Sequence, residues 1–198
     1  MKPSRWGSGA PMGIEAIAIG ASAGGIDALS QLLPALPTDA RLAVFVVVHL
    51  PPAQPSLLTE IFQLRCALWV QEAEDKQMVE PGTLYFAPPD YHLLLDAGPQ
   101  LALSADPPVH FSRPSIDALF ESAADVYGKA LLGIVLTGAS EDGASGLLAI
   151  HQAGGSTWVQ RPSDAATPAM PLYAIQRCPA ARVLSLEEMG MLFQDVAR

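Results

Sequence analysis

The stretch IEAIAIGASAGG, residues 14–25, decides the fold. It opens with a short, largely apolar run that ends at Gly20, which predicts a strand over Ile14 to Ile19. After the small residues of Gly20 to Gly25, apolar residues recur with helical spacing, which predicts a helix over 26–36. A strand that passes into a helix through a short glycine-rich loop is typical of an α/β fold.

The same alternation of strand and helix continues along the chain. Apolar runs predict further strands over 42–48, 131–136, 157–160 and 182–184. Periodic patterns predict further helices over 56–65, 115–130, 144–153 and 168–176, and from 186 onward. The segment 69–104 differs: its short apolar runs, 83–87, 92–95 and 101–103, are separated by Pro and Gly turns, which is typical of hairpins.

These patterns predict the class α/β, a three-layer doubly wound and mostly parallel sheet with an antiparallel hairpin insert. We expect one domain over residues 14–198, preceded by a disordered leader over 1–13 that is rich in Gly and Pro. The chain has 198 residues, of which half are hydrophobic, so disorder along its whole length is excluded.

Composition also limits the partners and the compartment. The 11 Lys and Arg against 20 Asp and Glu give a net charge of −9, which argues against nucleic acid and anionic membranes as partners. No apolar run approaches the roughly 18–20 residues of a membrane span, so we expect no membrane insertion. Two cysteines, Cys66 and Cys178, make no disulfide framework, which favours the cytoplasm.

No cofactor or metal is expected. The chain has no His-Glu-x-x-His motif, and Cys66 and Cys178 are too far apart in sequence to form a typical ligand pair. The glycine-rich loop at Gly20 resembles that of dinucleotide-binding folds, but such folds need an acidic residue near the end of the second strand. That position carries Val47-Val48-His49-Leu50, so a dehydrogenase is the weaker alternative.

Three expected strands end at residues that can carry chemistry. Ser22 follows the first strand within Gly-x-Ser-x-Gly, His49 follows the second, and Asp142 lies in the loop after the strand 131–136. The carboxyl ends of parallel strands lie at one edge of a sheet, where ligands bind. The sequence therefore predicts a nucleophile, a general base and an orienting acid at one site.

Plainer roles exist for the same residues. Ser22 could serve only as a helix cap, and Asp142 only as the N-cap of the helix that starts at Ala144. Glu141 is the alternative acid. The remaining histidines, His92, His110 and His151, do not follow a buried strand as His49 does.

Five stretches of the chain resemble the chemotaxis protein-glutamate methylesterase (CheB) family. They are IGASAGG (19–25), VVHLPP (47–52), EAEDKQMVEPGTLYFAPPDYHLLL (72–95), SRPSIDALFESAA (112–124) and TGASEDGASGL (137–147). The resemblance extends in order from about residue 14 to 198. It implies that Ser22, His49 and Asp142 form a Ser-His-Asp triad, and it places an oxyanion hole near Ala23 and Ala139.

The resemblance also implies an activity and a partner. Members hydrolyse γ-glutamyl methyl esters on the cytoplasmic helical bundle of methyl-accepting chemoreceptors, and many also deamidate glutamines there. Typical members carry an N-terminal phosphoacceptor receiver domain, which residues 1–13 cannot supply. We therefore expect either a stand-alone esterase domain regulated by a separate receiver or regulator protein, the interpretation that Met1 favours, or a piece of a longer chain.

Two departures from the family pattern leave a second hypothesis open. Ser140 stands where members usually have a glycine, in Thr-Gly-Met-Gly or Ser-Gly-Thr-Gly, and Ala23 stands where the residue after the nucleophile is often threonine. An altered acid loop would fit a weakly active or inactive domain that keeps the fold for binding. The three triad residues favour the enzyme.

Overall fold

The computed structural model describes residues 13–50 and 57–196, and a parallel sheet forms the centre of the protein. Its strands, in spatial order, are β3 (Trp69–Glu72), β4 (Thr83–Phe86), β2 (Ala43–Val48), β1 (Ala16–Ala21), β7 (Leu131–Val135), β8 (Ser156–Gln160) and β9 (Arg182–Leu184). Every neighbouring pair in this sheet is parallel. The separate pair β5 (His92–Asp96) and β6 (Gln100–Ser104) is antiparallel.

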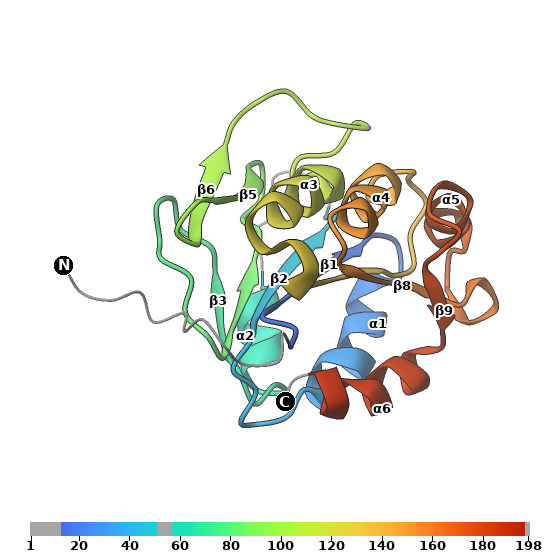
Figure 1. Cartoon of the computed structure of the whole chain (residues 1–198), viewed down its shortest axis with the longest axis horizontal. Helices are drawn as coiled ribbons and strands as arrows, with labels where there is room; N and C mark the ends of the chain where they lie inside the picture. Colours follow the sequence, from blue (N-terminus) through green and yellow to red (C-terminus); the bar gives the residue numbers. More distant parts are fainter. Residues whose placement is uncertain (1–12, 51–56, 197–198) are drawn as a thin grey trace.

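Helices cover both faces of the sheet (Figure 1). On one face lie α3 (Ile116–Tyr127), α4 (Ala144–Gln152) and α5 (Ala169–Arg177), and on the other lie α1 (Gly25–Leu32), α2 (Leu58–Gln63) and α6 (Leu186–Val196). The strands β1, β2 and β7 are buried along their whole length because both of their faces are covered. The predicted three-layer, doubly wound α/β class is therefore confirmed.

The prediction for residues 69–104 is only partly correct. The antiparallel hairpin exists, but it consists of β5 and β6 alone. The runs at 69–72 and 83–86 instead form β3 and β4, which extend the parallel sheet. The connecting segment 73–82 contains no helix. Its backbone bonds to the hairpin instead, because Lys76 N–H donates to Leu101 O and Leu101 N–H donates to Gln77 O, at 2.9 and 2.7 Å.

Element boundaries shift by a few residues from the predicted ones. The first strand runs from Ala16 through Gly20 to Ala21, rather than ending at Ile19. Gly20 lies within the strand and pairs with Val47 and Val135. The side chain of Ile116 packs directly against it, so a Cβ at this position would collide with Ile116. The first helix ends at Leu32 and passes into a short 3₁₀ turn that contains Pro34. Residues 1–12 of the predicted leader lie outside the described residues.

The register of the central strands sets the positions of the loops that follow them. Ala21 of β1 pairs with Val48 of β2, and Gly20 pairs with Val135 of β7. The chain therefore leaves these three strands at the same level, with Ser22, His49 and the loop after Val135 side by side. Among the described residues, no helix has the length and apolar character needed to cross a bilayer.

Candidate active site

Ser22 and His49 follow a pair of residues that face each other in the sheet. The ladder continues past the strands: His49 N–H donates to Ala21 O at 3.0 Å, and Ser22 N–H donates to Thr137 O at 2.9 Å. Main-chain bonds at Ala21 and Ser22 thus fix the end of β1 to the ends of both neighbouring strands. The structure confirms that the carboxyl edge of the sheet brings these loops together.

His49 and Asp142 are in direct contact. Nε2 of His49 lies 2.9 Å from Oδ2 of Asp142, although the two residues are 93 positions apart in sequence. The side chain of Asp142 is completely buried, while that of His49 keeps 11% of its surface exposed. Glu141, the alternative acid, is largely exposed and contacts His110 rather than His49. The structure therefore favours Asp142 as the partner of the imidazole.

The carboxylate of Asp142 accepts four hydrogen bonds. Besides His49, its donors are the backbone N–H groups of Ile116 (2.7 Å) and Asp117 (2.9 Å) and the hydroxyl of Ser115 (2.9 Å). Asp142 thus caps α3 and not α4, whose N-cap is Gly143. The plainer alternative, a cap of the helix at Ala144, is therefore wrong, because the side chain of Asp142 reaches across to the neighbouring helix.

This environment keeps Asp142 ionised. Burial by itself would raise the pKa of the Asp142 carboxyl, but the hydrogen bonds from His49 and from the N–H groups of Asp117 and Ile116 outweigh it. The net result is a pKa below the ordinary value of 3.8. A carboxylate only accepts hydrogen bonds, so Nε2 of His49 must carry the proton.

The other ring nitrogen of His49 is then the basic one. Nδ1 lies 3.4 Å from the hydroxyl of Ser112, a long contact that leaves its lone pair weakly engaged. Within residues 13–50 and 57–196, no hydrogen bond joins the hydroxyl of Ser22 to His49. Proton transfer from Ser22 to Nδ1 therefore requires a change from the arrangement seen here.

Two residues after β7 hold the Ser22 loop from the opposite side. The buried hydroxyl of Thr137 donates to Ala23 O at 2.9 Å and accepts the N–H of Thr167 at the same distance. Gly138 packs so closely that a Cβ there would lie 2.8 Å from Cβ of Ser22 and 2.7 Å from Cε of Met170. The loop after β7 thus lies between the Ser22 loop and the start of α5.

The two residues predicted for the oxyanion hole lie in these loops. Ala23 and Ala139 are both exposed, and in the described part of the chain neither backbone N–H has an acceptor. The neighbouring N–H of Gly138 is not available, because it donates to Thr167 O at 3.0 Å. Ser140, the departure in this loop, has its hydroxyl 3.1 Å from Asp142 N and accepts that N–H.

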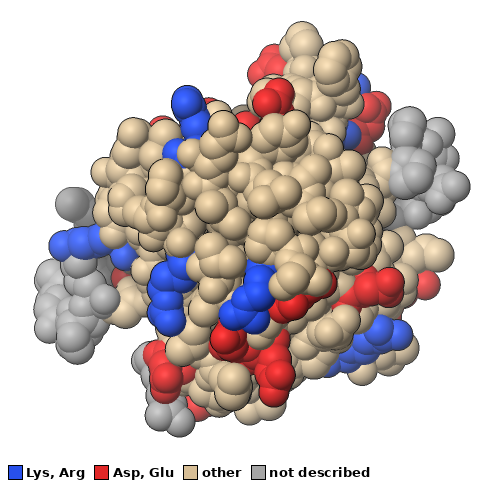
Figure 2. Space-filling view, turned by 90° about the vertical axis from the view of Figure 1, so that its right-hand side faces the viewer, with Lys and Arg blue, Asp and Glu red and all other residues tan. Residues whose placement is uncertain are grey.

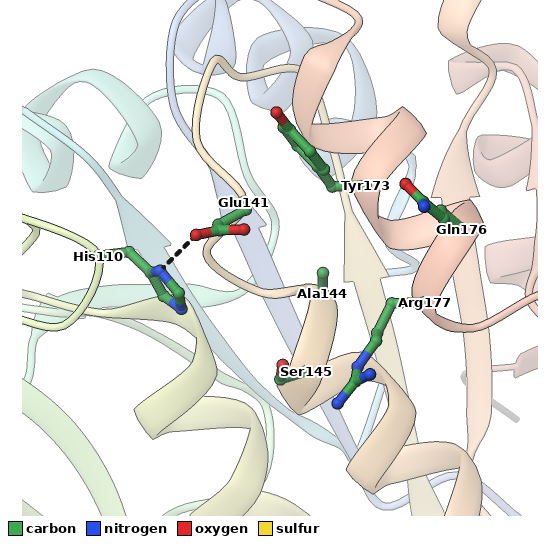
Figure 3. A pocket seen from close by; sticks show the side chains of 7 residues that line it. All are labelled: His110, Glu141, Ala144, Ser145, Tyr173, Gln176 and Arg177. Atoms are coloured by element: carbon green, nitrogen blue, oxygen red, sulfur yellow. Dashed lines mark ion pairs between the residues drawn. The ribbon is translucent and has the colours of Figure 1, made fainter.

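The remaining histidines have other surroundings. His92 is buried, where Nδ1 accepts the N–H of Ser115 at 3.1 Å. His110 contacts the loop before α4, where its Nδ1 lies 3.0 Å from Oε1 of Glu141 (Figure 3). His151 is exposed on α4.

Two cavities lie near these residues. One, of about 220 Å³, lies beside His49 and is lined by Phe111, Ser112 and several prolines. The other, of about 480 Å³, lies between His110 and Glu141 on one side and Tyr173, Gln176 and Arg177 of α5 on the other (Figure 3). Among the described residues, no cluster of three or more His, Cys, Asp or Glu could hold a metal ion.

Three residues at the site were not predicted. Ser115 donates to Asp142, Ser112 faces His49, and Asp117 accepts the N–H groups of Gly143 (2.9 Å) and Gly146 (2.6 Å) at the start of α4. Burial is the main cause that raises the pKa of Asp117 from 3.8 to about 6. An acidic residue in the first turn of a helix is expected to interact with the N-terminus of its own helix. The sequence therefore gave no indication that Asp117 accepts hydrogen bonds from a second helix.

Surface charge on the face drawn in Figure 2 is mixed. Figure 2 shows that Lys and Arg side chains on the face that it draws lie among Asp and Glu rather than in a basic patch, and that much of this face is uncharged. This face therefore lacks the stripe of positive charge that phosphate backbones require.

Comparisons with known proteins place this site in context. Residues 17–193 match the family described as CheB methylesterase. A protein of Leptospira interrogans named for protein-glutamate methylesterase and protein-glutamine glutaminase is 43% identical over 182 residues, which cover 92% of this chain and 94% of that protein. A protein of Salmonella typhi with both activities in its name is 39% identical, and this chain spans 50% of its length.

The fold of this chain also matches that of a solved CheB methylesterase structure. The crystal structure of the Thermotoga maritima CheB methylesterase catalytic domain superposes with a TM-score of 0.87 at 29% sequence identity. The match covers 92% of this chain and 98% of that domain.

Proposed function

The chain belongs to the CheB methylesterase family, and on this premise we propose that it hydrolyses γ-glutamyl methyl esters on the cytoplasmic helical bundle of methyl-accepting chemoreceptors. The products are methanol and a glutamate side chain. The observation that carries the proposal is the 2.9 Å contact between Nε2 of His49 and the buried carboxylate of Asp142, at the strand ends where Ser22 also lies. A histidine held by a buried carboxylate is the base that activates a serine by accepting its proton.

The first half of the reaction forms an acyl-enzyme. Ser22 Oγ attacks the ester carbonyl carbon while Nδ1 of His49 takes the hydroxyl proton. The tetrahedral intermediate collapses when the bond from the carbonyl carbon to the methoxy oxygen breaks. The proton on His49 then passes to the departing oxygen, which leaves as methanol.

The second half restores the enzyme. A water molecule gives a proton to His49 and attacks the acyl carbon, and the glutamate leaves as Ser22 regains its proton. Asp142 stabilises the imidazolium that forms in both halves, because its carboxylate stays ionised and contacts Nε2. Attack on a glutamine side chain follows the same steps with ammonia as the leaving group, and we include this deamidation in the proposal.

The negative charge on the intermediate needs donors. We assign them to the N–H groups of Ala23 and Ala139, which have no acceptor among the described residues. Each such donor contributes about 2.7–4 kcal/mol to transition-state stabilisation in serine hydrolases. The proposal places the enzyme in the cytoplasm, where the receptor bundle lies, and includes control by a separate receiver or regulator protein.

Methanol release from a methylated chemoreceptor cytoplasmic fragment tests this function. We expect the wild type to release methanol and Ser22→Ala to release none above background, with an unchanged melting temperature. The side chain of Ser22 makes no hydrogen bond within the described residues, so its loss does not weaken the fold. Ser30→Ala, a half-buried serine of α1, is the matched control and retains activity.

Two results would contradict the proposal. Full activity of Ser22→Ala would exclude Ser22 as the nucleophile. A folded wild type that releases no methanol from any methylated receptor of its own organism would favour the binding domain instead of the enzyme.

A further inference from the structure

Residues 109–112 form a tight turn with a strained tip. Val109 N–H donates to Ser112 O at 3.1 Å, and Ser112 N–H donates to Val109 O at 2.8 Å. The two tip residues, His110 and Phe111, have φ angles of 47° and 62°. Turns with two left-handed residues favour Asn and Gly, and a bulky side chain with positive φ is strained. The turn therefore carries a conformational cost at both tip positions.

Both neighbours of Phe111 are attached to the site. Nδ1 of His110 lies 3.0 Å from Oε1 of Glu141, the contact drawn in Figure 3, and its Nε2 lies 3.5 Å from Oδ2 of Asp117. On the other side, the hydroxyl of Ser112 lies 3.4 Å from Nδ1 of His49. These contacts of His110 and Ser112 hold the turn on both sides of Phe111.

Phe111 itself is fully exposed. An aromatic ring on a strained backbone, without contacts that offset the strain, stabilises nothing within the chain. Phe111 nevertheless lies close to the site, because Phe111 and Ser112 line the 220 Å³ cavity together with His49. A group that covers this ring therefore lies beside the general base.

The remaining walls of this cavity favour an apolar occupant. Pro89, Pro108 and Pro114 line it, and its two charged residues neutralise each other, since Arg113 Nη2 lies 2.7 Å from Oδ1 of Asp90. No unpaired charge is thus presented to a ligand there by the described residues of the cavity wall. Burial of an aromatic ring against an apolar side chain is a typical anchor of protein–protein contacts.

Ser22 does not line this cavity. A ligand that places its ester at Ser22 and covers Phe111 must therefore extend beyond the cavity that Phe111 lines. A helical polypeptide can do so, because it presents side chains one turn apart on the same face.

From these observations we propose that Phe111 is a docking anchor, which packs against an apolar side chain of the polypeptide substrate close to the esterified glutamyl residue. This inference rests on the proposed function, since it takes the substrate to be a helical protein segment. The cost of the strained turn is offset only when substrate is bound.

The test compares Phe111→Gly with the wild type on two substrates. Glycine accepts the left-handed conformation, so the variant should have a higher melting temperature. We expect kcat/KM for a methylated chemoreceptor fragment to fall about tenfold relative to kcat/KM for N-acetylglutamate γ-methyl ester, mainly through KM. Leu64→Ala removes another exposed apolar side chain, on a segment outside the cavity, and should leave this ratio unchanged.

An unchanged ratio in Phe111→Gly would overturn the anchor. So would an equal loss on both substrates, because that pattern means that the turn organises His49. A lower melting temperature would also overturn it, since it would show that Phe111 stabilises the free protein.

Binding separates failure of the anchor from failure of the proposed function. Ser22→Ala should bind the methylated fragment, and adding Phe111→Gly should weaken the Kd about tenfold. If the fragment binds but the wild type does not hydrolyse it, the proposed function is wrong, and this Kd ratio decides on the anchor. If Ser22→Ala does not bind the fragment, the anchor is wrong as well.

Discussion

Asp117 and Asp142 form reciprocal caps: the side chain of Asp142 accepts hydrogen bonds from the start of α3, and that of Asp117 accepts them from the start of α4. Asp142, in the loop before α4, accepts the N–H groups of Ile116 and Asp117 at the start of α3. Asp117, in the first turn of α3, accepts the N–H groups of Gly143 and Gly146 at the start of α4. The two helices are therefore locked by reciprocal caps, and the lock places the Asp142 carboxylate against His49.

Asp142→Asn should lower kcat by about three to four orders of magnitude while the protein stays folded. The amide nitrogen of Asn can donate to Nε2 of His49, and the proton then moves to Nδ1, where it blocks transfer from Ser22. Fewer backbone donors are accepted, so the free energy of unfolding should fall by about 1–3 kcal/mol. Methanol release and urea unfolding measure the two effects. Asp125→Asn, an exposed charge on α3, is the control; a normal rate in Asp142→Asn would point to another acid.

Asp117→Asn should flatten the dependence of stability on pH between about 4 and 6. Burial raises the pKa of Asp117 from 3.8 to about 6, so the folded state holds this proton more tightly than the unfolded state. The contribution to stability is thus present below pH 4 and is lost as the pH rises through 6, a change of about 3 kcal/mol. Asn keeps an oxygen for Gly143 and Gly146 but does not titrate. Urea unfolding at pH 4, 5, 6 and 7 measures the difference.

Two comparisons keep this prediction specific. Asp125→Asn removes an exposed carboxylate about two turns further along α3, which has no effect on the pKa of Asp117, and should retain the wild-type profile. Asp142, with its lowered pKa, acts in the opposite direction and in another window, because its contribution is lost only as the pH falls below about 4. Parallel curves for the wild type and Asp117→Asn would show that Asp117 ionises normally.

Gly138→Ala should lower kcat by about tenfold to a hundredfold, because displacement of a reacting group by about 1 Å costs rate on this scale. The new Cβ would lie 2.8 Å from Cβ of Ser22. Met170, on its other side, has a flexible side chain that can give way, but Cβ of Ser22 moves only with its backbone. We expect a small loss of melting temperature. Gly13→Ala, which meets no atom within 4 Å, is the control, and equal rates in both variants would mean that the Ser22 loop adapts.

The sequence was sufficient to predict the central part of the fold. Runs such as Ala43–Val48 are apolar without alternation, which only a strand covered on both faces tolerates, so the parallel sheet and its layers followed. The loops at the carboxyl ends of β1 and β2 then had to be neighbours. For that reason Ser22 and His49 could be placed together before any coordinates existed.

The strands β3 and β4 could not be assigned correctly in the same way. Parallel neighbours are normally joined through a helix, and the segment 73–82 shows no helical pattern. Its backbone groups bond instead to the β5–β6 hairpin, which lies later in the chain. Hydrogen bonds to a hairpin that lies later in the chain produce no periodic pattern in the sequence. The contacts of Asp117 and Ser112 were missed for the same reason, since they depend on how two helices and a loop pack.

The pairing of Ala21 with Val48 has a consequence for how such a sequence can diverge. Main-chain hydrogen bonds fix the spacing between the loops of Ser22 and His49, and every residue except proline can donate such bonds. Apolar side chains of β1 and β2 can therefore be exchanged for others of similar volume over many generations without altering that spacing. Selection on catalysis and selection on the core act here on separate parts of the same two strands.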